Sequence, residues 1–236
     1  IVNVVGSTIA KEAHHTIYTM AGPEIAVATT KAFSAQLVIL YILGVRFAAK
    51  LNKISVDTEK QLLDEISGIP EKVGELLLEK DKVQHYAATC FNCKSIFFIG
   101  RNIDYAIALE GSLKLKEISY IHSEAYAGGE LKHGTISLIE EDTLVVAVRS
   151  CEKLKDKIMS NVEQVISRGA RVLLVTSMDD VQESNKLSIV KIQKINELFS
   201  PSLSVIMLQL LAYYVAANKG LDIDKPRNLA KSVTVE

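Results

Sequence analysis

The chain has 236 residues, which is enough for one large domain or two small ones. Its formal net charge is −1, so the charge balance predicts neither nucleic acid nor an anionic membrane surface as a partner. Hydrophobic residues make up 48% of the chain, enough for a sizeable core, yet no run of eighteen apolar residues predicts a membrane span.

The N-terminal sequence carries no targeting signal. The chain opens with IVNVV, without an initiating Met and without the basic stretch of a signal peptide. We therefore expect a fragment or a processed product of a cytoplasmic protein.

The three cysteines are Cys90, Cys93 and Cys151, and the first two form a C-x-x-C pattern. A zinc site would need a second pair of ligands, and a redox motif would follow a strand rather than precede one. We expect reduced thiols at the end of a helix, no metal site and no cofactor.

The N-terminal part predicts short strands followed by helices. Strands are expected at 1–5 and 16–20. Thr29 or Thr30 suits the N-cap of a helix that runs to about residue 51. This helix is apolar nearly all round, so we expect it to be buried on more than one side, at a subunit contact. Three amphipathic helices are then expected, and they cover 58–66, 71–78 and 81–88.

From residue 95 onward, strands and helices alternate. The expected strands cover 95–99, 143–148, 171–176 and 187–192, and the expected helices cover 103–120, 153–168 and 200–218. Continuous apolar runs of this kind are typical of parallel strands buried on both faces. The pattern predicts an α/β fold with three layers, a doubly wound parallel sheet between helices, with a partial unit of the same kind before about residue 52.

One stretch, residues 107–138, combines a helix with many ionisable groups. Glu110, Lys114 and Glu117 are spaced to lie on one helical face, and His133 follows in a long glycine-bearing loop. A carboxylate, an amine and an imidazole are the groups that proton-transfer chemistry uses. The same three helical residues also fit a solvated, ion-paired surface, and His133 alone fits a structural histidine equally well.

Two longer motifs carry a resemblance to a known family. The run ALEGSLKLKEISYIHSEAYAGGELKHG at 108–134 and the ending PRNLAKSVTVE at 226–236 resemble the isomerase half of the glucosamine-6-phosphate synthase family. The segment EIAVATTKAFSAQL at 24–37 is similar to the same family. The resemblance covers the whole chain and implies sugar-isomerase (SIS) domains, each a parallel sheet between helices.

The resemblance implies a catalytic role for four residues. Glu117 matches the acid/base that moves a proton between C1 and C2 of the open-chain sugar, and Lys114 matches the lysine that assists it. His133 matches the histidine that opens the sugar ring, reaching the site from the partner subunit of a homodimer. Lys231 matches the lysine that forms a Schiff base with the ketose carbonyl.

Four further residues are expected around the substrate. Val27 and Thr29 match positions that line the sugar site, although Thr29 stands where Ser is expected. Ala230 precedes the Schiff-base lysine, and Glu110 is expected to position Lys114.

The resemblance also implies a domain division. Residues 1–52 would be the C-terminal part of a first, truncated SIS domain, 53–94 connecting helices, 95–220 the second SIS domain and 221–236 a tail that closes the active site. The sequence holds no glutaminase domain and no C-S-Q-S-G-E-T-like phosphate loop. We therefore expect this polypeptide alone not to make product from glutamine.

Three functions remain open from the sequence. The first is conversion of fructose 6-phosphate and ammonia to glucosamine 6-phosphate. The second is another SIS activity, such as a phosphosugar isomerase or a deglycase. The third is a non-catalytic regulator that binds a sugar phosphate, which would not need Glu117, Lys114 and Lys231 together.

Overall fold

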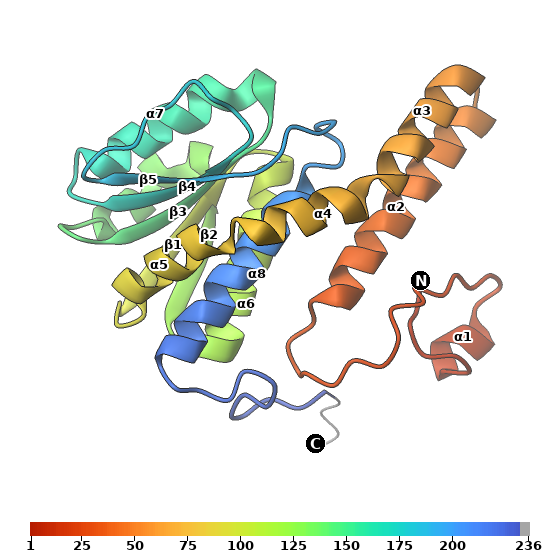
Figure 1. Ribbon diagram of the computed structural model, residues 1–236, viewed down its shortest axis with the longest axis horizontal. Coiled ribbons are helices and arrows are strands. Elements are labelled where there is room, and N and C mark those ends of the chain that lie inside the picture. The colour runs from red at the N-terminus through yellow and green to blue at the C-terminus, as the bar shows by residue number, and fades with distance from the viewer. Residues whose placement is uncertain (232–236) are drawn as a thin grey trace.

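The computed structural model describes residues 1–231 and contains a five-stranded parallel sheet, on the left in Figure 1. The strand order is β2-β1-β3-β4-β5. The strands are β1 (Ser95–Gly100), β2 (His122–Ala127), β3 (Leu144–Arg149), β4 (Arg171–Thr176) and β5 (Leu187–Lys191). Strand β3 is buried along its whole length, as expected for a central parallel strand covered on both faces.

Eight α-helices complete the described chain. They are α1 (Thr8–Glu12), α2 (Lys31–Lys50), α3 (Val56–Ser67), α4 (Ile69–Leu78), α5 (Lys80–Cys90), α6 (Ile103–Ser119), α7 (Lys155–Ile166) and α8 (Pro201–Asn218). Short 3-10 helices cover Gly128–His133, Thr135–Leu138 and Glu152–Leu154. From α3 onward the helices lie within a few residues of the predicted bounds.

The sheet lies between two helical layers. Helices α5, α6 and α8 pack on one face, where they share a core with Phe98 and Val146. Helix α7 covers the other face, where Ile158 and Val162 pack with Phe97. The predicted three-layer α/β class with a parallel sheet is therefore confirmed. Helix α8 is apolar on all sides because it is a core helix in contact with both α5 and α6.

The position of α6 is fixed at its start and its middle. Gly100 ends β1 so close to the first turn of α6 that a Cβ there would meet the Asp104 backbone at 2.4 Å. The buried Asp104 carboxylate then accepts hydrogen bonds from the amide and hydroxyl of Ser150, directly after β3. Further along, Gly111 allows α6 to approach Leu208 of α8 closely.

The two strands predicted near the N-terminus are wrong. Within residues 1–20, the described backbone forms a single bridge between Val2 and Tyr18 and no strand. Val4 and Val5 are 66% and 75% exposed, so they bury little apolar surface. A single pair of short segments without a third strand is too weak to form a ribbon.

Strand β2 was missed, because residues 121–138 were expected to be one loop. It lies at the edge of the sheet and pairs with β1 alone, from Ser95–His122 to Gly100–Ala127. Its sequence, HSEAYA, holds no apolar run, so it gives none of the signal of a buried strand.

Helix α2 differs from its prediction in burial. Ala32 and Val45 are its buried residues, while Leu40 and Phe47 are 53% and 63% exposed. The prediction that α2 is buried on more than one side is therefore wrong for the single chain. That a second subunit covers α2 remains a prediction.

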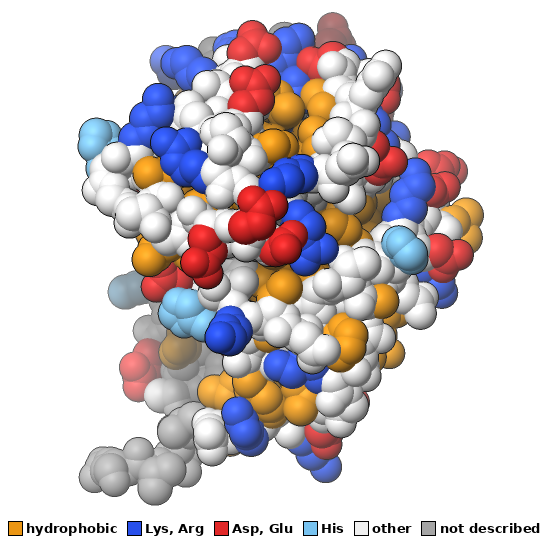
Figure 2. Space-filling view, turned by 90° about the vertical axis from the view of Figure 1, so that its left-hand side faces the viewer, with side chains coloured by type: hydrophobic (Ala, Val, Ile, Leu, Met, Phe, Trp, Pro, Cys, Tyr) orange, Lys and Arg blue, Asp and Glu red, His pale blue; other side chains and the backbone are white. Residues whose placement is uncertain are grey.

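By length and composition, α2 and α8 are both apolar enough to cross a membrane. In α8, 61% of the apolar window is buried inside the protein, which identifies a core helix, whereas the share in α2 is 11%. One or two such helices are weak grounds for a membrane protein, so the absence of a membrane partner stays a prediction. Figure 2 shows acidic and basic side chains intermixed with apolar ones over one face of the molecule, as the near-zero net charge predicts.

Three glycine-to-alanine variants test the packing of α6. Gly100→Ala should lower the free energy of unfolding by more than about 3 kcal/mol, because rigid backbone surrounds the new Cβ. Gly111→Ala should cost about 1–3 kcal/mol, because the Leu208 side chain can partly move away. Gly74→Ala in α4 is the control, with open space around it and an expected gain of about 0.5–1 kcal/mol. Urea denaturation measures all three, and equal stabilities of the Gly100 and Gly74 variants would contradict the packing described.

Candidate active site

Lys114 is a buried ammonium between two carboxylates of its own helix. Its side chain is 4% exposed, with Nζ 2.5 Å from Oε2 of Glu117 and 3.7 Å from Oε1 of Glu110. Spacings of three and four residues place all three groups on one face of α6, as the sequence predicted. Because the Lys114 side chain is 4% exposed, the alternative of a solvated, ion-paired surface is wrong. A lysine this buried almost always has a charged partner.

The pKa of Glu110 is shifted upward. Burial raises the pKa of its carboxyl above the ordinary value of 4.5, the Lys114 charge opposes this rise, and the Glu117 charge adds to it. The site therefore holds two carboxylates and one ammonium in a space largely removed from water. Perturbed carboxylates of this kind are frequent in sites that transfer protons.

Lys231, on the C-terminal tail, reaches the segment that precedes α2. Its Nζ donates to Oε2 of Glu24 at 2.8 Å, to the carbonyl oxygens of Ala26 and Val27 at 3.2 and 3.4 Å, and to Oγ1 of Thr29 at 3.3 Å. These partners lie more than 200 residues away in sequence. The fold thus brings Lys231 to Val27 and Thr29, two positions that the sequence predicted at the same site.

Glu24 is a residue that the sequence prediction missed. One carboxylate oxygen accepts from Lys231, and the other accepts from the backbone amide of Ala32 at 3.2 Å, in the first turn of α2. Thr30 occupies the N-cap position without a side-chain hydrogen bond, so Glu24 takes the capping role expected of Thr29 or Thr30. Burial acts to raise the pKa of Glu24, but the hydrogen bonds from Lys231 and Ala32 and the charges of Lys231 and Lys31 lower it below its ordinary value.

A small cavity lies between α6, α8, the tail and the segment before α2. Its volume is about 160 Å³. The lining includes Lys114 from α6, Gln209 and Tyr213 from α8, Ala26 from the segment before α2 and Asp224 from the tail. Ala26 also accepts a hydrogen bond from Lys231, so both lysines converge on this short segment.

Gln209 is the second residue that the sequence prediction missed. Its Nε2 is buried and has no hydrogen-bond partner among residues 1–231. A buried donor without a partner is costly, and it lines the same cavity as Lys114. A hydroxyl of a small polar molecule in the cavity would satisfy it. Nothing in the sequence distinguishes this glutamine from others on an apolar helix.

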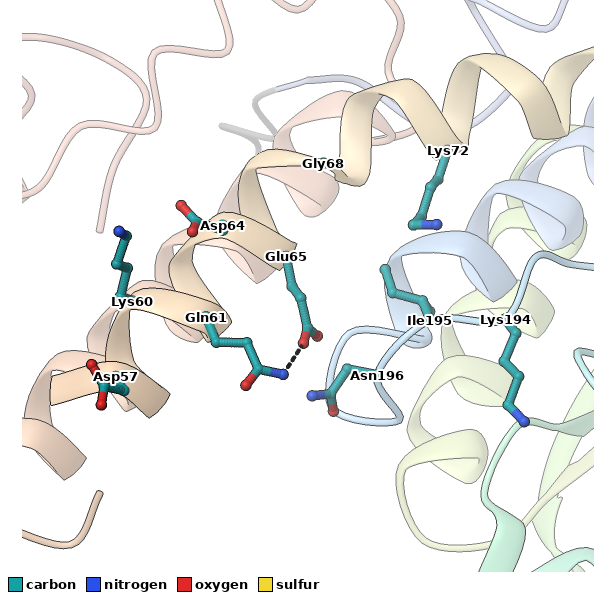
Figure 3. Close-up of a pocket in the computed structure, with 10 residues that line it drawn as sticks. All are labelled: Asp57, Lys60, Gln61, Asp64, Glu65, Gly68, Lys72, Lys194, Ile195 and Asn196. Carbon is teal, nitrogen blue, oxygen red and sulfur yellow. Dashed lines mark hydrogen bonds between the residues drawn. The ribbon is translucent and has the colours of Figure 1, made fainter. Parts of the chain in front are cut away.

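A much larger cavity lies elsewhere. It measures about 900 Å³ and is open, between helices α3 and α4 and residues 194–196 (Figure 3). Side chains of both charge signs line it, including Lys72, Lys194, Asp57 and Glu65. Gln61 donates a hydrogen bond to Glu65. None of the predicted catalytic residues lines it, so its size does not make it the candidate site.

His133 lies apart from this cluster. It is exposed at the end of the 3-10 helix Gly128–His133, and no hydrogen bond or ion pair joins it to Lys114, Glu117 or Lys231. Within one chain the structure therefore does not bring the predicted histidine to the predicted site. Ala230 is exposed on the tail beside Lys231, and residues 232–236, which complete the tail motif, lie outside the described residues.

Within residues 1–231, the cysteines and His122 form no metal-binding arrangement. Cys90, Cys93 and Cys151 are free thiols, and Cys90 is the last residue of α5. Burial raises the pKa of Cys90 to about 12, which opposes thiolate chemistry. His122 lies 3.5 Å from Glu124, but no group of three potential metal ligands occurs in the described part of the chain.

Comparison with known proteins identifies the family. The sequence model of the SIS domain matches residues 1–46 and 90–219, which is most of the chain. The chain belongs to the SIS-domain family. Residues 108–134 lie within the matched range, whereas the ending at 226–236 lies outside it. A solved structure from Silicibacter pomeroyi has the same fold, with 23% identity and a TM-score of 0.76.

Two relatives cover the whole chain or nearly so. The isomerizing glutamine–fructose-6-phosphate aminotransferase of Clostridium acetobutylicum is 52% identical over 241 residues, covering 100% of this chain and 39% of that protein. The solved C-terminal domain of glucosamine-fructose-6-phosphate aminotransferase from Francisella tularensis has 36% identity and a TM-score of 0.91, covering 94% of this chain and 63% of that one. These matches confirm the resemblance that the motifs at 108–134 and 226–236 predicted. The SIS chain spans about two fifths of the length of the curated relative.

The raised pKa of Glu110 predicts a pH-dependent stability. The pKa of Glu110 is higher in the folded state than in the unfolded state. The contribution of Glu110 to the free energy of unfolding is therefore fully present below the unfolded-state pKa, and it is lost as the pH rises through the folded-state pKa. Glu110→Gln removes the ionisation and also one partner of Lys114, so the informative quantity is the melting temperature of the variant minus that of wild type. This difference should be more favourable to the variant at pH 8 than at pH 4. The exposed Glu163→Gln on α7 is the control and should show no such difference. A larger gain at pH 4 than at pH 8 would contradict the pKa direction.

Proposed function

We propose that this chain is the isomerase part of an enzyme that converts fructose 6-phosphate and ammonia to glucosamine 6-phosphate. The observation that carries this proposal is the convergence of Lys231 and Lys114 on the segment 24–30, with Glu117 in contact with Lys114. The curated relative named as an isomerizing glutamine–fructose-6-phosphate aminotransferase supports it, as does the solved C-terminal domain of a glucosamine-fructose-6-phosphate aminotransferase. The proposed substrate is a sugar phosphate, and no cofactor enters the reaction.

In the proposed mechanism, Lys231 forms the imine with the ketose carbonyl. A lysine attacks a carbonyl only as the neutral amine, so its ammonium must first lose a proton. The Glu24 carboxylate, 2.8 Å from Nζ, is the nearest acceptor for that proton. Expulsion of water from the resulting adduct gives the imine, which acidifies the neighbouring C–H and offers ammonia a carbon to attack.

Glu117 is the proposed base for the transfer between C1 and C2. A carboxylate can take a carbon-bound proton and return it to the adjacent carbon. Because C2 carries nitrogen after imine formation, the intermediate of this transfer is an enolamine whose oxygen is on C1. The Lys114 ammonium stabilises the negative charge that develops on this C1 oxygen, and burial strengthens the effect because water screens it little. Glu110 positions Lys114, and the unpartnered amide of Gln209 donates to a sugar hydroxyl.

His133 completes the proposed site from a second subunit. Within one chain it is exposed, and no hydrogen bond or ion pair joins it to Lys114 or Lys231, which fits a role in a neighbouring active site. A homodimer that shares His133 in this way would open the sugar ring in each site with the partner's imidazole.

The source of ammonia lies outside this chain in the proposal. The sequence holds no glutaminase domain and no C-S-Q-S-G-E-T-like loop for the phosphate, and the curated relatives are much longer. We therefore test the function in a hybrid enzyme, with this chain placed after the N-terminal part of the Clostridium acetobutylicum relative that it does not match.

Borohydride trapping tests the Schiff base. Incubation of the hybrid with fructose 6-phosphate and borohydride should attach the sugar to Lys231, as found by peptide mass spectrometry, and Lys231→Arg should abolish the adduct. Glu117→Gln should keep the adduct but lower turnover with ammonium by about 10²–10⁴-fold, because the proton transfer is lost. Turnover without an adduct would favour another SIS isomerase, and binding with neither adduct nor turnover would favour a regulator.

Mixing two inactive variants tests the shared site. Glu117→Gln and His133→Ala hybrids are each expected to be inactive. If His133 serves the partner's site, a heterodimer holds one site with both residues intact and one with neither. Co-refolding the two variants at equal amounts should then restore about a quarter of wild-type activity, since about half of the dimers are mixed and each has one of two sites. No recovery, with mixed dimers shown by native mass spectrometry, would place His133 in its own subunit's site.

A further inference from the structure

Tyr120 ends α6 in a backbone conformation that disfavours tyrosine. Its φ of 60° and ψ of 15° lie in the left-handed region. Glycine or asparagine usually occupies this position at the end of a helix, because a larger side chain brings Cβ too close to the next carbonyl. The contacts of the Tyr120 side chain have to offset this local cost.

Those contacts go to Arg227 of the tail. The Tyr120 hydroxyl accepts a hydrogen bond from the backbone amide of Arg227 at 2.6 Å. The guanidinium carbon of Arg227 lies 4.2 Å from the centre of the Tyr120 ring, a cation–π contact. A residue that is locally unfavourable at a helix end thus holds a segment 107 residues further along the chain.

The tail is held at a second point just before Arg227. The backbone amide of Val27 donates to the carbonyl oxygen of Asp224 at 2.9 Å. Asp222 accepts from the amides of Asp224 and Lys225, which fixes a turn there. Pro226, between the two anchors, is buried. The path of the tail is therefore set up to Arg227, four residues before Lys231.

We propose that Tyr120 is a positioning residue, which clamps the tail through Arg227 so that Lys231 is delivered to its site. Glu117 lies three residues earlier, in the last turn of α6, so the end of one helix carries both the proposed base and the clamp for the proposed nucleophile. The role of Lys231 in this statement rests on the proposed function. The statement that Tyr120 holds the tail does not depend on the proposed function.

Three variants separate the two contacts. Tyr120→Phe loses the hydroxyl bond to Arg227 and keeps the ring. Tyr120→Asn loses both contacts but suits the left-handed backbone, so the helix end should keep its stability. Tyr105→Phe, near the start of the same helix, is the control.

The first measurement needs no catalysis. In the chain described here, trace acetylation followed by mass spectrometry gives the rate at which Lys231 reacts relative to the exposed Lys219. Tyr120→Asn should raise the relative rate several-fold, Tyr120→Phe should raise it less, and Tyr105→Phe should leave it unchanged, with melting temperatures measured for each. An unchanged rate in both Tyr120 variants overturns the clamp, and the milder Phe variant decides if the Asn variant does not fold.

The second measurement uses the hybrid enzyme. Tyr120→Asn should slow borohydride trapping of fructose 6-phosphate on Lys231 and lower kcat/KM by about tenfold to a hundredfold, because a displaced nucleophile reacts poorly. Faster acetylation with unchanged trapping overturns the positioning role. If the wild-type hybrid forms no adduct at all, the proposed function fails, and the acetylation rates alone still decide whether Tyr120 holds the tail.

Discussion

A buried positive charge sets the main constraint on this structure. The Lys114 side chain is 4% exposed and is compensated by Glu117 and Glu110 on the same helix. Removing one partner of a buried ion pair typically costs about 3–5 kcal/mol, so α6 has to keep all three groups in register. The close approach at Gly100 and Gly111 fixes the helix against the sheet and against α8.

The second lysine is held quite differently. Lys231 lies on an irregular tail, is 40% exposed and depends on partners that precede α2. Glu24 links these parts, because its two oxygens bind the tail lysine and the first turn of α2. One charged group is therefore rigid on a buried helix, while the other can exchange its partners without unfolding a core element.

The smallness of the cavity beside Lys114 follows from the same arrangement. The segment 24–30 and the tail lie over Lys114 and Ile118 of α6 and leave about 160 Å³. The larger open groove between α3, α4 and residues 194–196 is lined by charged side chains of both signs and holds none of these groups (Figure 3). Chemistry and cavity size therefore point to different places. The buried ion cluster is the better guide because buried ionisable groups with shifted pKa values gather at functional sites.

Local pattern alone determined the layers of the fold and one face of the site. Apolar runs such as Ile96–Ile99 within β1 identify a buried parallel strand, and the spacing of Glu110, Lys114 and Glu117 fixes a common helical face. Both signals arise within a few residues of the chain. The same reasoning failed for the strands at 1–5 and 16–20, since a strand needs partners that a local pattern does not reveal, and for β2, whose polar edge sequence carries no apolar run.

Only the tertiary structure decided which groups meet. The burial of Lys114, the capture of Lys231 by Glu24, and the contact of Tyr120 with Arg227 each join residues or surfaces whose proximity depends on how distant elements pack. Glu24 and Gln209 have no distinguishing spacing in the sequence, so their positions at the site could not be read from it. Periodicity specifies the faces of helices and strands, whereas contacts across more than 100 residues depend on the whole packed chain.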